Sequence, residues 1–158
     1  MLFWFVGTAV LAVWFVFGDS RFDYRFLIVG ALAPDLVDLP FGGARVLHSV
    51  VGSIAALVVV MLATIGRRPV RRRLLALPIG MMLHLVFDAA FTNNGVFWWP
   101  FGGIRFEDAP WPTWERGPWS AVLEVVGLGL CYWIVRRFGL RDPERRSRFW
   151  RTGILEPC

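Results

Sequence analysis

The sequence predicts an all-α protein, a polytopic membrane helix bundle of about five hydrophobic segments, one of them short, with a Trp/Pro-rich external loop. Hydrophobic residues make up 56% of the 158 residues, and the mean hydropathy of +0.55 exceeds that of ordinary soluble domains. The apolar residues form runs of helical length, separated by stretches rich in arginine, proline and glycine. The segments are residues 2–18, about 26–39, about 46–66, about 74–91 and about 118–138.

The first segment, LFWFVGTAVLAVWFVFG from Leu2 to Gly18, contains no charged residue. As a helix it would span about 26 Å, close to the thickness of the hydrocarbon core. No basic stretch precedes it and no small-residue cleavage site follows it, so we expect a retained helix rather than a signal peptide. The second segment is short for a crossing, and FGGARV (residues 41–46) predicts a turn after it.

The remaining segments are oriented by the arginines. All 17 basic residues are arginine, and most cluster in residues 67–73 and 136–151. The positive-inside rule makes both clusters cytoplasmic, which places the N-terminus and residues 92–119 outside the plasma (inner) membrane. The five tryptophans and four prolines of residues 92–119 predict an interfacial cap or lid. We therefore expect one transmembrane domain, residues 1–138, and an arginine-rich cytoplasmic tail, residues 139–158.

The same arginine clusters could indicate a nucleic-acid-binding protein. Short basic loops beside apolar spans fit anionic lipid headgroups better, so we expect membrane lipid and no nucleic acid as partner. The two cysteines, Cys131 and Cys158, lack metal-ligand spacing. The residues give no indication of an oligomeric state.

Ionisable residues inside the apolar segments are the strongest indication of a site. MLHLVFDAAF (residues 82–91) places His84 and Asp88 one helical turn apart, and the topology puts Asp35, Asp38 and His48 at the same outer depth. A charge deep in hydrocarbon costs about 2.5–3.5 kcal/mol on insertion scales, so several together need compensation. Imidazoles and carboxylates ligate zinc, manganese and iron. We predict these five residues as ligands of one or two divalent ions, zinc first and manganese or iron as alternatives.

Other residues are candidates for a direct part in a reaction. Glu124, about a turn and a half into the fifth segment, could be a general base or support a ligand, or it could hydrogen-bond a neighbouring helix. Arg45, one turn before His48, could bind a phosphate bidentately or be an ordinary interface arginine. Arg105 is a second candidate for an anionic group. Simpler roles exist for the predicted ligands too, such as a helix cap at Asp35.

The order of these motifs resembles a known family. Pro34 with Asp35 and Asp38, then His48 with Ser49, His84 with Asp88, and Trp99 with Pro100 are similar to the motifs of the membrane-bound, metal-dependent hydrolases, also described as LexA-binding, inner-membrane-associated hydrolases. The resemblance covers roughly residues 28–106 and implies a metal-dependent hydrolase without naming its substrate. Many members separate the two aspartates by one residue and continue with His-Pro, whereas this chain has two intervening residues and then Leu-Pro. The resemblance therefore implies a ligand role for Asp35 more directly than for Asp38.

The leading hypothesis from the sequence is metal-dependent hydrolysis of a phosphoester or related bond in a lipid or lipid-linked substrate at the outer membrane face. One alternative is a cation-coupled transporter or ion-conducting protein, in which the acidic cluster binds a cation for passage. A second alternative is a noncatalytic membrane scaffold whose arginine-rich tail recruits a cytoplasmic partner or anionic lipid. Deletion of residues 139–158 should abolish the function of a scaffold, whereas a hydrolase should largely survive it.

Overall fold

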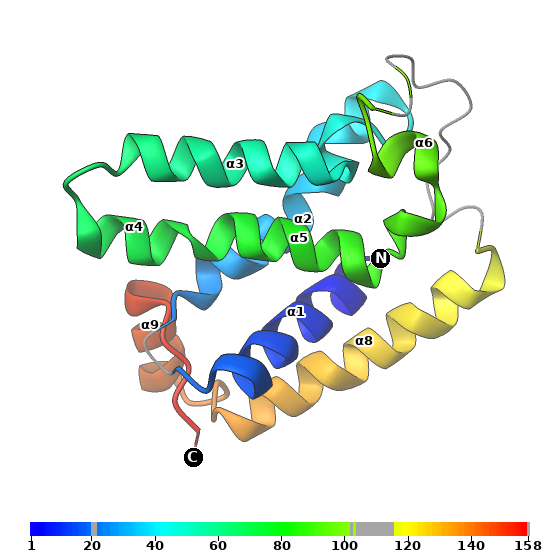
Figure 1. Ribbon diagram of the computed structural model, residues 1–158. Coiled ribbons are helices and arrows are strands. Elements are labelled where there is room, and N and C mark those ends of the chain that lie inside the picture. Colours follow the sequence, from blue (N-terminus) through cyan, green and yellow to red (C-terminus); the bar gives the residue numbers. More distant parts are fainter. Residues whose placement is uncertain (20–21, 102, 104–115, 158) are drawn as a thin grey trace.

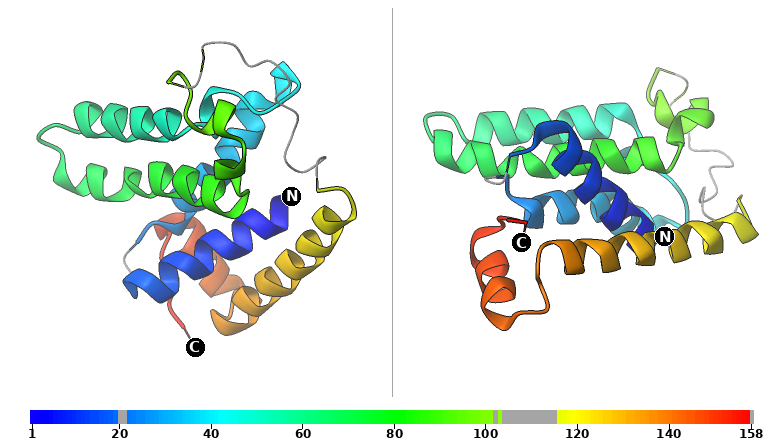
Figure 2. Two further views of the ribbon diagram at one scale, coloured as in Figure 1. Left: turned by 45° about the vertical axis from the view of Figure 1, so that its right-hand side comes forward. Right: turned by 90° about the horizontal axis from the view of Figure 1, so that it is seen from below.

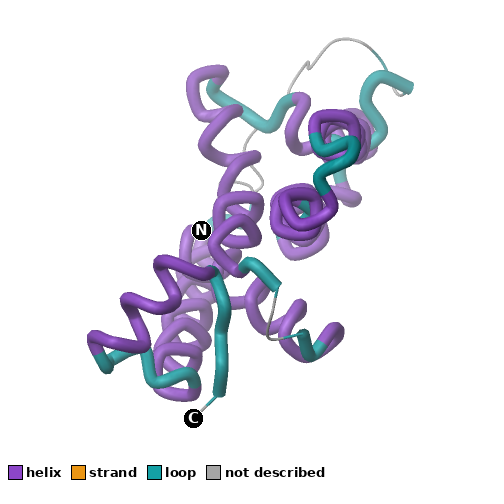
Figure 3. The backbone as a smooth tube through the Cα atoms, turned by 90° about the vertical axis from the view of Figure 1, so that its left-hand side faces the viewer, coloured by secondary structure: helices purple, strands orange, loops and turns teal. Residues whose placement is uncertain are grey.

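The computed structural model of the chain describes residues 1–19, 22–101, 103 and 116–157. Within these residues all regular secondary structure is helical, which confirms the predicted all-α class (Figures 1 and 3). The elements are α1 Leu2–Phe17, α2 Tyr24–Asp38, η1 Leu39–Phe41, η2 Val46–His48, α3 Val50–Ala63, α4 Arg68–Leu74, α5 Ala76–Phe87, η3 Ala90–Thr92, α6 Asn94–Phe97, α8 Pro118–Arg137 and α9 Pro143–Thr152, where η denotes a 3₁₀ helix.

Most of the described helices are shorter than a membrane crossing requires. Among the described residues, only α8 is both long and apolar enough to cross a bilayer, judged by length and composition, while α1 and α3 are apolar but shorter. The structure therefore shows a helical bundle, and its crossing of a membrane five times stays a prediction. The ends of α1 and α8 agree closely with the expected segments, because Gly18 in left-handed conformation ends α1 and Pro118 begins α8.

Local capping explains where the other helices begin. Asp23 accepts a hydrogen bond from the N–H of Arg25 at the start of α2, and Ser49 accepts one from the N–H of Gly52 at the start of α3. Beyond α2, η1 ends at Gly42, whose φ of 71° reverses the chain as the FGGARV turn predicted. This reversal brings η2 back alongside the end of α2.

Two close helix pairs organise the bundle (Figures 1 and 2). Gly30 of α2 faces the main chain of α5 at Leu77, and Gly80 of α5 faces the main chain of α2 between Leu27 and Ala31. α1 packs along α8, where Gly127 lies against the main chain at Trp4. Small residues at these crossings let the helix backbones approach, as is typical of membrane helices.

The C-terminal residues, predicted as a separate cytoplasmic tail, pack onto this bundle. Phe149 of α9 and Leu155 join a buried cluster with residues of α1, α2 and α8, and their exposed fractions are 7% and 2%. The N–H of Tyr24 donates to the carbonyl oxygen of Gly153 at 2.9 Å, and Arg25 donates to the carbonyl oxygen of Trp150 at 2.8 Å. The described residues 139–157 are therefore tied to the beginning of α2.

The two ends of the bundle differ chemically. The end of α2, η2, the start of α3 and the end of α5 lie together at one end (Figure 1). α4 and α9, which carry eight of the 17 arginines, lie at the other end. This separation agrees with the arrangement that the arginine rule required. The assignment of the two ends to the outside and the inside of a membrane stays a prediction.

Candidate metal centre

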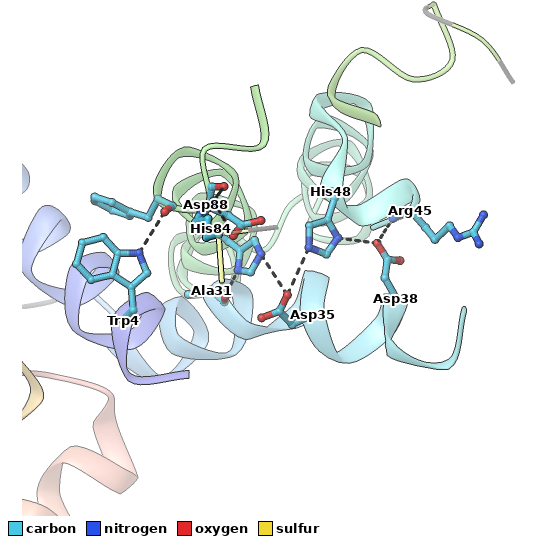
Figure 4. A network of polar contacts seen from close by, with 10 residues as sticks. Trp4, Ala31, Asp35, Asp38, Arg45, His48, His84 and Asp88 are labelled. Atoms are coloured by element: carbon cyan, nitrogen blue, oxygen red, sulfur yellow. Dashed lines mark hydrogen bonds and ion pairs between the residues drawn. The ribbon is translucent and has the colours of Figure 1, made fainter. Parts of the chain in front are cut away.

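Three side chains from three elements meet at one end of the bundle. Asp35 lies in the last turn of α2, His48 ends η2, and His84 lies in the last turn of α5 (Figure 4). Oδ1 of Asp35 is 3.4 Å from Nε2 of His48 and 3.6 Å from Nε2 of His84. Both imidazoles are fully buried, whereas the Asp35 side chain is 29% exposed, so solvent and ligands reach the group from the side of Asp35.

The orientation of His84 is set by the main chain of α2. Its Nδ1 lies 2.7 Å from the carbonyl oxygen of Ala31. A carbonyl oxygen can only accept, so Nδ1 carries the proton and, in the neutral ring, Nε2 presents a lone pair. This buried Nε2 has no hydrogen-bond partner among the described residues. The ring also packs against Phe5 of α1, with ring centroids 4.0 Å apart.

The orientation of His48 is set by a carboxylate. Its Nδ1 donates to Oδ2 of Asp38 at 2.8 Å, and the same oxygen accepts the main-chain N–H of Arg45 at 2.9 Å. The buried Asp38 side chain therefore directs Nε2 of His48 toward Asp35. Ser49, the residue after His48, caps α3 and fixes the imidazole to a rigid helix start.

These distances fit a cation. Bonds of about 2.0–2.2 Å to nitrogen and oxygen at tetrahedral angles place the ligand atoms roughly 3.4 Å apart. The three atoms of Asp35, His48 and His84 all lie within 4.8 Å of one another. Both imidazoles also have the outer hydrogen-bond partner that metal-binding histidines usually have. Three protein ligands leave a coordination position for water or substrate, as in catalytic zinc sites.

Asp88 extends the group beyond the three ligand atoms. It follows His84 by one turn, and its side chain is 2% exposed. Nη2 of Arg116 lies 3.2 Å from Oδ1 of Asp88 and also donates to the main-chain carbonyl oxygen of Asp88. Nη1 of Arg116 is buried and has no hydrogen-bond partner among the described residues. A carboxylate and a guanidinium thus lie beside the histidines.

The five predicted ligands thus take different positions. Asp35, His48 and His84 form the candidate coordination group, and Asp38 lies behind His48. Asp88 lies beside His84 and pairs with Arg116 rather than joining the three ligand atoms. The prediction of a cation site is supported in this coarser form, and the identity and number of ions stay predictions.

Two predicted reaction residues lie elsewhere. The carboxylate of Glu124 accepts the main-chain N–H groups of Leu2, Phe3 and Trp4 at 3.1, 3.2 and 3.3 Å, so it caps the start of α1. The hydrogen bond to a neighbouring helix, the alternative for Glu124, is what the structure contains. The Arg45 side chain extends away from the imidazoles (Figure 4), and it donates to the carbonyl oxygen of Phe41. Arg105 lies outside the described residues.

Three further contributors to the site are not predicted from the sequence. The carbonyl oxygen of Ala31 and the ring of Phe5 orient His84, and Arg116 pairs with Asp88. A main-chain contact and a ring contact have no recognisable motif in the sequence. The only signal for Arg116 was a positive charge immediately before the fifth hydrophobic segment.

Fold and site together define an all-helical protein with a candidate His₂Asp cation site at one end of its bundle. Comparison of the chain with protein-family models, with curated proteins and with solved structures found no match. The resemblance to the metal-dependent membrane hydrolases accordingly stays a prediction from short motifs.

Proposed function

We propose that this chain is a membrane-embedded, metal-dependent hydrolase that cleaves a phosphoester or related bond of a lipid or lipid-linked substrate. One observation carries the proposal: the lone pair of His84 Nε2 faces Oδ1 of Asp35, another acceptor, at 3.6 Å. Two facing acceptors repel each other unless a positive charge lies between them. Protonation of His84 would remove only the repulsion between His84 and Asp35. A divalent cation would do the same and would also be bound by Nε2 of His48.

The side chains around the cation site have distinct roles in this proposal. A divalent ion held by Asp35, His48 and His84 would supply Lewis-acid polarisation and water activation near neutral pH. Asp88, beside His84, accepts the proton released by the attacking water. Arg116 holds Asp88 in place and directs its remaining N–H donors toward the anionic group of the substrate, a role that the sequence suggested for Arg45.

Exposed apolar side chains support a membrane and a lipid substrate. Around the site end, Leu36, Leu39, Phe41, Phe91 and Phe101 are all more than half exposed. Soluble proteins rarely leave large contiguous apolar surfaces uncovered, and aromatic rings favour the lipid headgroup layer. An amphiphile in that layer would reach the exposed side of Asp35 without leaving the membrane.

The same surface character continues along α8. Its outward residues include Val122, Val125, Val126 and Leu128, each exposed by 45% or more. An apolar outer surface on a helix of this length is typical of contact with lipid tails. The position of the cation site at the end of the helices also favours an enzyme over a transporter, because transporter sites lie near the bilayer midplane.

The test measures metal content and turnover in the same samples. Protein purified in detergent is analysed for bound zinc, manganese and iron and then assayed for hydrolysis of phosphomonoester and phosphodiester lipids in mixed micelles. We expect wild type and Asp142→Asn to bind metal and turn over, because Asp142 caps α9 at the far end. Asp35→Asn and His84→Ala should lose both properties.

Different failures would mean different things. Unchanged metal content in His84→Ala, or full activity in metal-free protein, would overturn the proposal. Metal binding without turnover would refute the proposed substrate class but leave the proposed metal centre supported. Cation flux into liposomes that depends on Asp35, in the absence of turnover, would replace the hydrolase by the transporter alternative.

A further inference from the structure

A groove lined by arginines lies at the end of the bundle opposite to the candidate metal centre. It has a volume of about 570 Å³ and lies between α4 and the C-terminal part of the chain. Arg68, Arg72 and Arg73 line it from α4, and Arg151 lines it from α9. We call it the α4–α9 groove. Its volume is within the range of small-ligand sites.

The charges in the α4–α9 groove do not balance. Asp23, the acidic residue in its lining, pairs with Arg25 at 2.8 Å. Arg72 pairs with Asp19 at 2.6 Å. Among the described residues, no ion pair joins Arg68, Arg73 or Arg151 to a carboxylate. Three guanidinium groups from two separate helices thus surround one hollow with an excess of positive charge.

This arrangement suits a phosphate group. Like charges on neighbouring side chains repel each other, and an anion between them reverses the sign of that interaction. Guanidinium groups present planar pairs of N–H donors that match two oxygens of a phosphate. Pro69, Thr152 and Ile154 complete the lining and add apolar surface beside the arginines.

The surroundings indicate that the phosphate belongs to a membrane lipid. Large apolar side chains nearby are exposed: Ile65 before α4 (72%), Val70 on α4 (45%), Phe17 at the end of α1 (59%) and Trp150 on α9 (65%). Exposed apolar side chains and tryptophan next to arginines are typical of the level where hydrocarbon meets headgroups. A soluble anion would not need this apolar border.

We propose that the α4–α9 groove binds the phosphate of an anionic phospholipid headgroup. Basic pockets between helices on the arginine-rich side of membrane proteins are recognised sites for such headgroups. The bound lipid would bridge α4 and α9, and α9 already holds the start of α2 through Gly153 and Tyr24. Lipid binding should therefore raise the thermal stability of the folded chain. The inference rests on the membrane location in the proposed function but not on the hydrolysis, because the two sites lie at opposite ends of the bundle.

The test compares two triple variants of equal charge. The groove variant carries Arg68→Gln, Arg73→Gln and Arg151→Gln, and the control variant carries Arg67→Gln, Arg71→Gln and Arg146→Gln. The control arginines are the N-cap of α4, a residue within α4 and a residue of α9, and they do not line the groove. The full chain in neutral detergent is titrated with short-chain phosphatidylglycerol or phosphatidylcholine, and the midpoint of thermal unfolding and lipid adducts in native mass spectra are recorded.

We expect phosphatidylglycerol, and not phosphatidylcholine, to stabilise wild type and the control variant. Each groove arginine should contribute about fivefold in affinity, and all three about a hundredfold. If the triple variant does not fold, Arg68→Gln and Arg151→Gln are tested singly, and each should show the fivefold loss. An equal loss in the control variant would show general surface charge and overturn the proposal. Inorganic pyrophosphate that binds as tightly as the lipid and displaces it would overturn the lipid assignment.

Discussion

Close packing of α2 on α5 should control cation binding through Gly80, although Gly80 is not a ligand. In Gly80→Ala, the new Cβ would lie 2.7 Å from the main-chain nitrogen of Ala31 and closer still to the carbonyl oxygen of Leu27. Ordinary contact begins at 3.4 Å and the carbonyl oxygen of Leu27 would lie at 2.3 Å, so the two backbones must separate by about 1.1 Å. The main chain of α2 cannot retreat as a flexible side chain would. The 2.7 Å bond from His84 to Ala31 must lengthen accordingly.

We expect Gly80→Ala to weaken zinc binding about 10- to 100-fold, the range for loss of an outer partner of a metal-binding histidine. The assay is competition against a chromophoric zinc chelator in detergent, with thermal unfolding measured in parallel. Gly129→Ala is the matched control, because a Cβ at Gly129 of α8 would meet nothing within 4 Å. Wild-type zinc affinity in Gly80→Ala would refute the reasoning that this crossing positions the site.

Three further predictions concern side chains and segments with assigned contacts. Asp38→Asn should weaken zinc binding about 10- to 100-fold in the same chelator competition, because it removes the charge behind His48, and unchanged affinity would contradict that role. Glu124→Gln should lower the free energy of unfolding by about 1 kcal/mol, as for a lost helix cap, and leave zinc affinity unchanged, whereas a loss of zinc binding would return Glu124 to the site. Deletion of residues 139–158 should lower the unfolding temperature, because Phe149 and Leu155 are buried in the bundle. Loss of function after this deletion would therefore be expected of a hydrolase as well as of a scaffold. An unchanged unfolding temperature would show that the tail is independent of the bundle.

The helical class and the ingredients of the site could be read from the sequence. Apolar runs of helical length predict helices wherever they pack, and the predicted residues 2–18 and 118–138 match α1 and α8 closely. His84 and Asp88 were expected to be neighbours because a one-turn spacing places two side chains on one helix face. Ionisable residues in apolar runs are costly, which singled out Asp35 and His48 as well.

The different roles of these residues could not be predicted from the sequence in the same way. Asp38 is separated from His48 by ten positions, and the turn at Gly42 decides that its carboxylate meets Nδ1 of His48 rather than a cation. Depth along a segment says nothing about which neighbour a side chain faces. Depth alone therefore predicts Glu124 as a site residue, whereas the contact of α1 with α8 places its carboxylate at the start of α1.

The sequence by itself determined which local structures form and which polar groups need compensation, because helix periodicity and the cost of burying charge act over a few residues. Only the tertiary structure decided which of those groups meet. The contact of His84 with Ala31, the pairing of Asp88 with Arg116 and the packing of Phe149 all join residues distant in the chain. Such contacts depend on the angles and separations of whole helices, which small residues such as Gly30 and Gly80 set where two backbones touch.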